Sequence, residues 1–431
     1  MKLHFWGATD EVTGSMTFLE LPQGLAMIDC GLTQGTPRTE EINLRPLPFL
    51  PSKISAIIVT HAHLDHSGYL PRLVKKGFKG PIYCTPPTAK LMRIILLDSA
   101  KLNEDEFYDK NDVQETLHLI KTFEWKENFD CLGAMIHFFP AGHILGASSV
   151  MIKSENKSIV FSGDLGRTDD PILPPLEPCP AADIVIMEST YGGKVRTGDI
   201  KKELHTFLAT IATESRVAIV ASFAVARAQT LLTLIYQFYQ DHPEYKARVV
   251  MDSPMMKEAN KVYQQYSSLT KLPETVFSAL DEIDAIEHQK EWDSLKRKSG
   301  PLIIISSSGM LTGGRISRHL ENWQDDKRAI LYLPGYQGEG TPGRSFLEGK
   351  REIKGKEDMF FWTGEVWTSE AFSSHADQND LLKWVSANTK ASQIFLLHGE
   401  HHAKLALKAK LEESFSGKVI IPERGTIGDI I

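Results

Sequence analysis

The sequence lacks any apolar run approaching the roughly twenty residues that a membrane-spanning helix requires. Its amino-terminal segment turns polar within ten residues and has no long apolar core of the kind found in signal peptides. The four cysteines are widely spaced and include no Cys-x-x-Cys pair, which argues against a disulfide framework. We therefore expect a cytoplasmic protein that has no membrane partner.

An excess of basic residues is also missing, because the formal net charge is −7. This charge argues against a surface coated with basic patches for non-specific nucleic-acid binding, although it permits a local basic groove or a metal-centred phosphate site. The sequence shows no internal repeat and no low-complexity segment. Its 431 residues exceed the size of one compact core, so more than one domain is expected.

The most informative segment that is present runs from His61 to His66 and contains three histidines and Asp65. It follows the apolar run 56–59, which predicts a strand. Imidazole nitrogens and carboxylate oxygens suit Zn²⁺ and similar divalent ions. Four potential ligands in six residues exceed what one ion can easily accept, so the segment indicates a pair of metal ions. A solvated histidine-rich loop is the alternative.

Acidic or histidine residues also follow other short apolar runs in the first part of the chain. Asp29 follows the run 25–28, Asp164 follows 158–161 and Glu188 follows 184–187. Such residues often only cap turns. Ligands gather outside the carboxyl ends of strands, however, and the repetition favours a metal-binding α/β layer.

The local context makes His143 and Asp164 candidate ligands. His143 follows the apolar run 136–139 and sits among glycines that let a backbone turn tightly, although it could be a loop or core histidine. The carboxylate of Asp164 could bridge two cations through its two oxygens, and capping a turn or helix is its alternative role.

The middle of the chain has a different texture. Apolar runs at 217–221, 248–251, 302–305 and 329–333 predict strands separated by amphipathic helices, which is typical of a parallel, doubly wound unit. After Phe360 the chain returns to short strands and histidine-bearing turns. We therefore expect a first domain in two parts, 1–196 and 361–431, with an inserted domain at 197–360.

The inserted domain contains candidates for contacts with phosphate. Ser307, Ser308 and Gly309 follow a predicted strand and precede a predicted helix, so exposed amides and hydroxyls there could bind an anion. Arg227 begins an amphipathic helix of the same domain. Ser374, which lies beside His375 in the segment 361–431, is a further candidate. A plain turn and a solvated helix charge are the alternative interpretations of the loop and of Arg227.

Taken in order, these motifs resemble those of the metallo-β-lactamase superfamily, and the resemblance covers nearly the whole chain. Segments 188–192, 372–375 and 397–399 resemble three further motifs of its β-CASP branch, which acts on nucleic acids. The resemblance implies an α/β fold, a metallo-β-lactamase αββα sandwich with an inserted doubly wound parallel α/β β-CASP domain.

The resemblance also implies roles for individual residues. One zinc would be held by His61, His63 and His143. The second zinc would be held by Asp65, His66 and His398, and both ions would share Asp164 and a hydroxide. Asp65 is counted as catalytic as well. Asp29 would fix an imidazole tautomer or the ligand turn. Two Zn²⁺ are expected, and other divalent ions would also fit.

The implied activity is that of a zinc-dependent ribonuclease. Histidine at position 398 favours RNA over DNA, and the expected substrate is single-stranded. A metal-bridging hydroxide would attack the phosphodiester, and His375, oriented and kept cationic by Glu188, would act as the general acid. Cleavage would leave 5′-phosphate and 3′-hydroxyl ends, and we expect an endonuclease.

Several alternatives remain open from sequence. The chain could be a 5′-to-3′ exoribonuclease of ribonuclease J type, a small-substrate metallo-hydrolase, or a scaffold subunit without catalysis. We expect the active site where the two domains meet, and the chain could form an oligomer.

Overall fold

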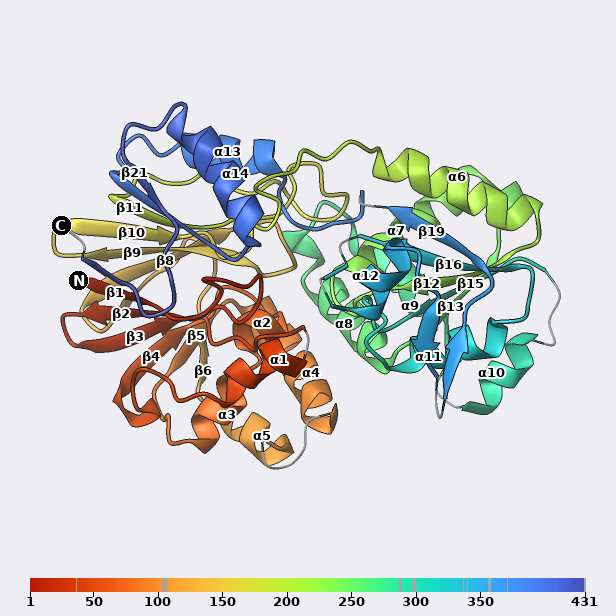
Figure 1. Cartoon of the computed structure of the whole chain (residues 1–431), viewed down its shortest axis with the longest axis horizontal. Coiled ribbons are helices and arrows are strands. Elements are labelled where there is room, and N and C mark those ends of the chain that lie inside the picture. The colour runs from red at the N-terminus through yellow and green to blue at the C-terminus, as the bar shows by residue number, and fades with distance from the viewer. Residues whose placement is uncertain are drawn as a thin grey trace. The chain divides into compact units, whose positions relative to one another are not determined.

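The computed structural model describes residues 1–35, 37–102, 107–286, 289–296, 300–335, 337–338, 340–355, 358–369 and 371–429. The chain forms two compact units (Figure 1). Unit 1 comprises Met1–Val195 with His375–Ile431, and unit 2 comprises Arg196–Ser374. Unit 2 is therefore an insertion in the sequence of unit 1.

The first sheet of unit 1 contains seven strands. In spatial order they are β22 (Ile427–Asp429), β1 (Lys2–Phe5), β2 (Thr17–Leu21), β3 (Gly24–Ile28), β4 (Ile54–Ile58), β5 (Ile82–Cys84) and β6 (Ile120–Thr122). The pairs from β22 to β3 are antiparallel, and the pairs from β3 to β6 are parallel. The parallel half carries β3 and β4, whose ends precede the candidate ligands Asp29 and His61.

The second sheet of unit 1 has the same number of strands. In spatial order they are β21 (Lys418–Ile420), β20 (Gln393–Leu397), β11 (Ile184–Glu188), β10 (Lys157–Phe161), β9 (Ser148–Ser154), β8 (Ala134–Pro140) and β7 (Asn128–Cys131). The pairs from β21 to β10 are parallel and the remainder antiparallel. The three central parallel strands end next to Asp164, Glu188 and His398.

The core of unit 1 contains apolar side chains from both sheets, such as Leu19 and Ile58 from the first and Phe138 and Ile186 from the second. Helices lie on the outer sides: α13 and α14 cover the second sheet, and α3, α4 and α5 lie along the first (Figure 1). The helices of unit 1 are α1 (Pro37–Glu40), η1 (Glu41–Leu44), η2 (Pro51–Lys53), α2 (Leu64–Ser67), α3 (Leu70–Lys75), α4 (Pro86–Leu102), α5 (Lys110–His118), α13 (Gln378–Ser386) and α14 (His401–Glu412). The unit is an αββα sandwich.

Unit 2 is built around one sheet in which every strand pair is parallel. Its order is β14 (Asp284–Ala285), β13 (Arg248–Asp252), β15 (Leu302–Ser306), β12 (Val217–Ala221), β16 (Ala329–Pro334) and β19 (Glu365–Ser369). A hairpin of β17 (Glu352–Lys354) and β18 (Met359–Phe361) is separate from it. The strands β12, β13, β15 and β16 contain the four apolar runs from which the sequence predicts strands.

Helices connect these strands, as expected of parallel neighbours. They are α6 (Ile200–Thr213), α7 (Arg227–Asp241), η3 (Pro243–Tyr245), α8 (Pro254–Gln265), η4 (Ser267–Leu269), α9 (Glu274–Asp281), α10 (Gln289–Lys296), α11 (Arg315–Trp323) and α12 (Pro342–Leu347). The predicted doubly wound parallel α/β architecture is therefore present.

The compact units divide the chain after residues 195 and 374. The domain boundaries predicted from sequence, after residues 196 and 360, stay predictions. Residues 361–374 lie in unit 2 because β19 adds to its sheet beside β16, with Tyr332 opposite Trp367. The sequence pattern did not indicate this pairing, since it depends on a long-range contact between strands.

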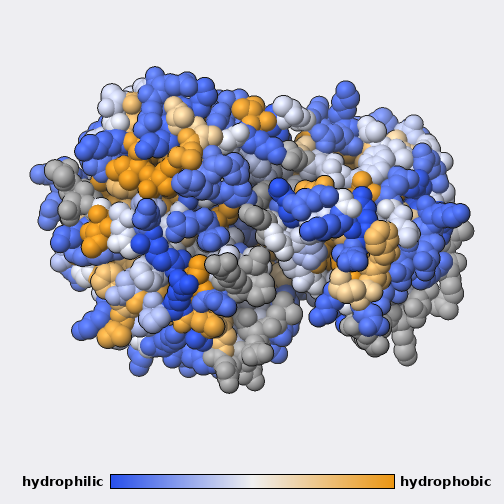
Figure 2. Space-filling model, viewed as in Figure 1, coloured by the Kyte–Doolittle hydropathy of each residue, from blue (hydrophilic) through white to orange (hydrophobic). Residues whose placement is uncertain are grey.

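The face seen in Figure 2 is mainly hydrophilic, with hydrophobic side chains in separate groups. Some large apolar side chains are nevertheless exposed, among them Leu44 and Leu50. Among the residues that the structure describes, no helix has both the length and the apolar character needed to cross a bilayer.

Truncating the sandwich core tests this arrangement. Phe138 on β8 is fully buried, and Phe138→Ala should lower the free energy of unfolding by about 3–5 kcal/mol through lost burial and a new cavity. Met135→Ala on the same strand is the matched control, because Met135 is 49% exposed and should change stability by less than about 0.5 kcal/mol. Denaturant unfolding measures both, and equal losses would contradict the assigned core.

Candidate metal centre

The ligand turn connects β4 to the short helix α2. His63 is the residue before α2, and its carbonyl accepts hydrogen bonds from the backbone N–H groups of His66 and Ser67. This tight turn lets His61, His63 and His66 direct their rings to one place. His61 is fully buried, and the rings of His61 and His66 lie 4.1 Å apart between centroids.

A first set of ligand atoms comes from His61, His63, His143 and Asp164, whose donor atoms all lie within 4.8 Å of one another. His63 Nδ1 is 3.2 Å from His61 Nε2 and 3.1 Å from His143 Nε2. Asp164 Oδ2 is 3.5 Å from His61 Nε2 and 3.6 Å from His143 Nε2. Three imidazoles and one carboxylate oxygen thus converge on one point.

A second set faces the other oxygen of Asp164. His66 Nε2 lies 3.0 Å from His398 Nε2 and 3.2 Å from Asp164 Oδ1. His398 Nε2 is 3.4 Å from Asp65 Oδ2 and 3.6 Å from Asp164 Oδ1. His398 therefore lies beside the ligand turn although it is distant from it in sequence.

The donor set fits divalent cations. Asp164 is 2% exposed, and its Oδ1 has no hydrogen-bond donor among the described residues. A buried carboxylate oxygen without a donor carries a large desolvation cost, which a cation would remove. The two oxygens face separate histidine sets.

The pKa values of three of the histidines agree with this fit. Burial lowers the pKa of His63 to about 4 and places the pKa values of His61 and His143 well below the usual range. These rings are neutral near pH 7, which is the form that binds a metal ion. Burial opposes charge on His66 as well, but the carboxylates of Asp164 and Asp29 together outweigh burial and raise the pKa of His66.

Asp29 and Thr60 lie behind the histidines. Asp29 Oδ2 is 2.7 Å from His66 Nδ1, so it can accept the proton on that nitrogen and leave Nε2 free for a ligand role. Thr60 donates its backbone N–H to Asp29 Oδ1 (2.7 Å) and its hydroxyl to Asp29 Oδ2 (2.9 Å). The Thr60 hydroxyl is also 3.1 Å from His61 Nδ1.

His398 has an equivalent support in Thr190. The Thr190 hydroxyl donates to the His398 carbonyl (3.2 Å) and lies 3.1 Å from His398 Nδ1. Neither threonine was singled out from sequence. The available signals were that Thr60 directly precedes His61 and that Thr190 lies in the Glu188 motif.

Glu188 and His375 meet at the edge of the cluster. His375 Nδ1 is 3.2 Å from Glu188 Oε1, which also accepts the backbone N–H of Leu165 (2.7 Å). The ring of His375 lies 4.4 Å from that of His143. Burial lowers the pKa of His375, but the charge and hydrogen bond of Glu188, together with the charges of Asp164 and Asp65, outweigh burial and raise this pKa.

The candidate phosphate loop lies in unit 2. Gly309 follows β15, and its carbonyl accepts a hydrogen bond from Gln337 Nε2 (3.0 Å). The Ser308 hydroxyl accepts the backbone N–H of Thr312 (3.2 Å), so it closes its own turn. Arg227 begins α7 with its guanidinium 4.6 Å from the Phe223 ring. Phosphate binding by this loop stays a prediction, as it does for Ser307 before Ser308 and for Ser374 at the end of unit 2.

Comparison with known proteins places this geometry in a family. Residues 9–222 match the metallo-beta-lactamase superfamily, 228–346 the Beta-Casp domain and 364–422 the Zn-dependent metallo-hydrolase RNA specificity domain. The ribonuclease TTHA0252 of Thermus thermophilus is 32% identical over 94% of this chain and 95% of its own length. The chain belongs to the β-CASP branch of the metallo-β-lactamase superfamily.

Other relatives of this β-CASP protein cover the same span. An RNase J-like protein of Methanocaldococcus jannaschii is 31% identical over 99% of both chains. The cleavage and polyadenylation specificity factor 73 of Drosophila melanogaster is 27% identical over 95% of this chain and 61% of its own length. A solved structure of a protein of unknown function from Enterococcus faecalis V583 shares the fold, with a TM-score of 0.59 and 15% identity over 99% of both chains. The recognition made from sequence is thereby confirmed, and the chain is a metallo-hydrolase that binds divalent metal.

The Thr60 hydroxyl offers a test of the centre. Thr60→Val keeps the side-chain shape but removes the group that joins Asp29 to His61, so metal affinity should fall about 10–100-fold. Competition with a chromogenic chelator measures it. Thr60→Ser retains the hydroxyl and should bind metal like the wild type, and equal affinity in the valine variant would contradict the role of Thr60.

Proposed function

We propose that this β-CASP protein is a zinc-dependent endoribonuclease that holds two Zn²⁺ and cleaves single-stranded RNA to leave 5′-phosphate and 3′-hydroxyl ends. The observation that carries the proposal is the position of Asp164, whose two oxygens face separate ligand sets. Two ions bound there would lower the pKa of a water molecule and neutralise charge at a phosphate. The proposed site residues are those predicted from sequence.

His375 supplies the leaving-group chemistry in this proposal. Hydrolysis joins a water oxygen to phosphorus and breaks the bond from phosphorus to the 3′ oxygen, which needs a proton as it leaves. His375 holds its Nδ1 against Glu188, so Nε2 is the atom that can deliver this proton. One ring nitrogen of His375 lies within 4.8 Å of a carboxylate oxygen of Glu188 and one of Asp164.

The choice of RNA rests on relatives. The relatives include a ribonuclease, an RNase J-like protein, a cleavage and polyadenylation specificity factor and an endoribonuclease. The match of residues 364–422 to an RNA specificity domain supports the same substrate. These findings make the chain an RNA hydrolase, and the endonucleolytic mode is our proposal.

The proposal includes a cytoplasmic location. The four cysteines are free and buried, as suits a reducing compartment. An oligomeric assembly stays open to measurement.

End-labelled RNA distinguishes the possible reactions. Zinc-loaded protein should convert a 5′-labelled and a 3′-labelled single strand into internal fragments from the first time points, with 5′-phosphate on downstream pieces. Gel analysis of both labels, with and without phosphatase treatment, reads position and end chemistry. Mononucleotides released first from the 5′ end would instead show the exonuclease alternative.

The pH dependence tests His375 and Glu188. A general acid works in its protonated form, which exists below its pKa, so the rate should fall as pH rises through the raised pKa of His375. Glu188→Gln removes the charge that raises this pKa, so the alkaline limb should move to lower pH.

Two further variants complete that measurement. His375→Ala should lower kcat for RNA by about 100-fold or more with metal content unchanged. The exposed Glu412→Gln should leave the profile as in the wild type. Full RNA activity in His375→Ala would contradict this role of His375. Turnover of a thioester or lactam by this variant at the wild-type rate would favour a small-substrate hydrolase.

A further inference from the structure

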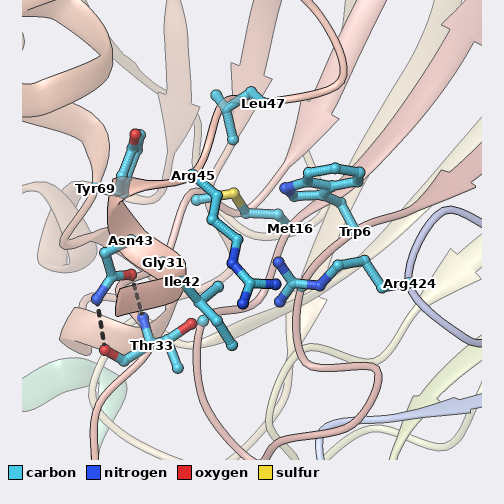
Figure 3. A pocket seen from close by; sticks show the side chains of 12 residues that line it. Trp6, Met16, Gly31, Thr33, Ile42, Asn43, Arg45, Leu47, Tyr69 and Arg424 are labelled. Atoms are coloured by element: carbon cyan, nitrogen blue, oxygen red, sulfur yellow. Dashed lines mark hydrogen bonds between the residues drawn. The ribbon is translucent and has the colours of Figure 1, made fainter. Parts of the chain in front are cut away.

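A pocket in unit 1 outside the ligand cluster brings two arginines together. It is lined mainly by residues of the connection between β1 and β2 and of the segment that follows Asp29. Among the described residues that line it, Arg45 and Arg424 carry the charged side chains. Their guanidinium groups point toward each other, beside the ring of Trp6 (Figure 3). These arginines come from opposite ends of the chain, and neither belongs to a motif found in the sequence.

Neither guanidinium has a carboxylate partner. Among the described residues no acidic oxygen lies within 4.0 Å of Arg45 or Arg424. Nη1 of Arg424 is buried and has no hydrogen-bond acceptor there. Burial and the charge of Arg45 lower the pKa of Arg424, and Asp10 and Glu11 oppose this only from a distance. A buried guanidinium N–H without an acceptor beside a like charge is unfavourable unless an anion binds.

The backbone around the pair is fixed. Asn43 accepts a hydrogen bond from the Thr33 N–H (2.9 Å) and donates one to the Thr33 carbonyl (2.7 Å), which holds the turn that ends at Arg45 (Figure 3). Gly425 N–H donates to the Phe5 carbonyl (2.8 Å), which holds Arg424 beside β1. The Arg424 guanidinium lies 5.4 Å from the centre of the Trp6 ring.

Strand β22, which comes after Arg424 in the sequence, leads away from the arginine pair. Strand β22 pairs antiparallel with β1, and its last residue, Asp429, lies opposite Lys2. Trp6 follows the other end of β1, so β22 runs away from the arginine pair.

We propose that Arg45 and Arg424 form a phosphate-binding site on unit 1. Paired guanidinium groups match the planar, bidentate geometry of phosphate oxygens. The phosphate could belong to the backbone of RNA or to a free phosphate compound. The Tyr69 hydroxyl points away from the pair, so the two arginines are the groups that would bind it (Figure 3).

The pocket shares a wall with the ligand turn. Gly31 lines the pocket, and a Cβ atom at Gly31 would lie 1.6 Å from the carbonyl oxygen of Asp65. Cys30 N–H donates to the His66 carbonyl (2.8 Å) in the same segment. Backbone of this segment therefore lies between the pocket and the candidate ligands Asp65 and His66. This closeness favours an RNA strand that also reaches the ligand cluster as the source of the phosphate.

Inorganic phosphate is the first probe. The melting temperature of the full chain should rise with phosphate at constant ionic strength, and the apparent Kd should increase about tenfold or more in Arg45→Gln and Arg424→Gln. Arg93→Gln removes one exposed charge from the same unit and should respond like the wild type. Without phosphate, Arg45→Gln should melt no lower than the wild type, because it relieves repulsion within the pair.

RNA is the second probe. Fluorescence anisotropy measures the affinity for a labelled oligouridine at several salt concentrations, in an Asp164→Asn background that limits cleavage. If one backbone phosphate binds the pair, the slope of log affinity against log salt concentration should be smaller by about 0.7 in each arginine variant. An unchanged slope with a lost phosphate response would assign the site to a free phosphate compound. Neither readout requires that the chain cleave RNA.

The proposal is overturned if phosphate does not stabilise the wild type, or if it stabilises both arginine variants equally well. Arg424→Lys guards against misfolding, because it keeps a positive charge beside Trp6 while losing the bidentate fork. It should fold like the wild type and bind phosphate more weakly.

Discussion

The structure of unit 1 depends on one buried carboxylate. Asp164 is almost inaccessible to solvent, and its two oxygens face two separate groups of imidazoles. Such a group is strongly destabilising when uncompensated, so its position is acceptable only if histidines and bound cations surround it. The shared carboxylate therefore ties the two sides of the sandwich to a single centre, and that centre in turn requires both sheets.

The two sheets meet this requirement through their parallel halves. Asp29 and His61 follow β3 and β4 of the first sheet, and Asp164, Glu188 and His398 lie at the ends of β10, β11 and β20 of the second. Side chains at the carboxyl ends of parallel strands meet at one edge of a sheet. Hydroxyl groups of threonines then fix the orientation of the rings, as is common around metal ligands.

The arginine side chains are a second feature of the molecule, separate from the candidate metal ligands. The net charge of the chain is negative, and many of its arginines have carboxylate partners, such as Arg248 with Asp284 and Arg216 with Glu365. Within the part of the chain that the structure describes, the pair of Arg45 and Arg424 lacks such partners. An anionic polymer would therefore be attracted to a few defined positions rather than to the whole surface.

The sequence by itself was enough to predict the candidate ligands, the strands that precede them and the inserted parallel unit, because these depend on short-range patterns: apolar runs and the residues that end them. It did not reveal the roles of Thr60 and Thr190, the place of β19 in the sheet of unit 2 or the meeting of Arg45 with Arg424. Those features follow from distances between segments far apart in the chain. Only tertiary packing sets such distances, since hydrogen bonds and charge pairs act over a few ångströms.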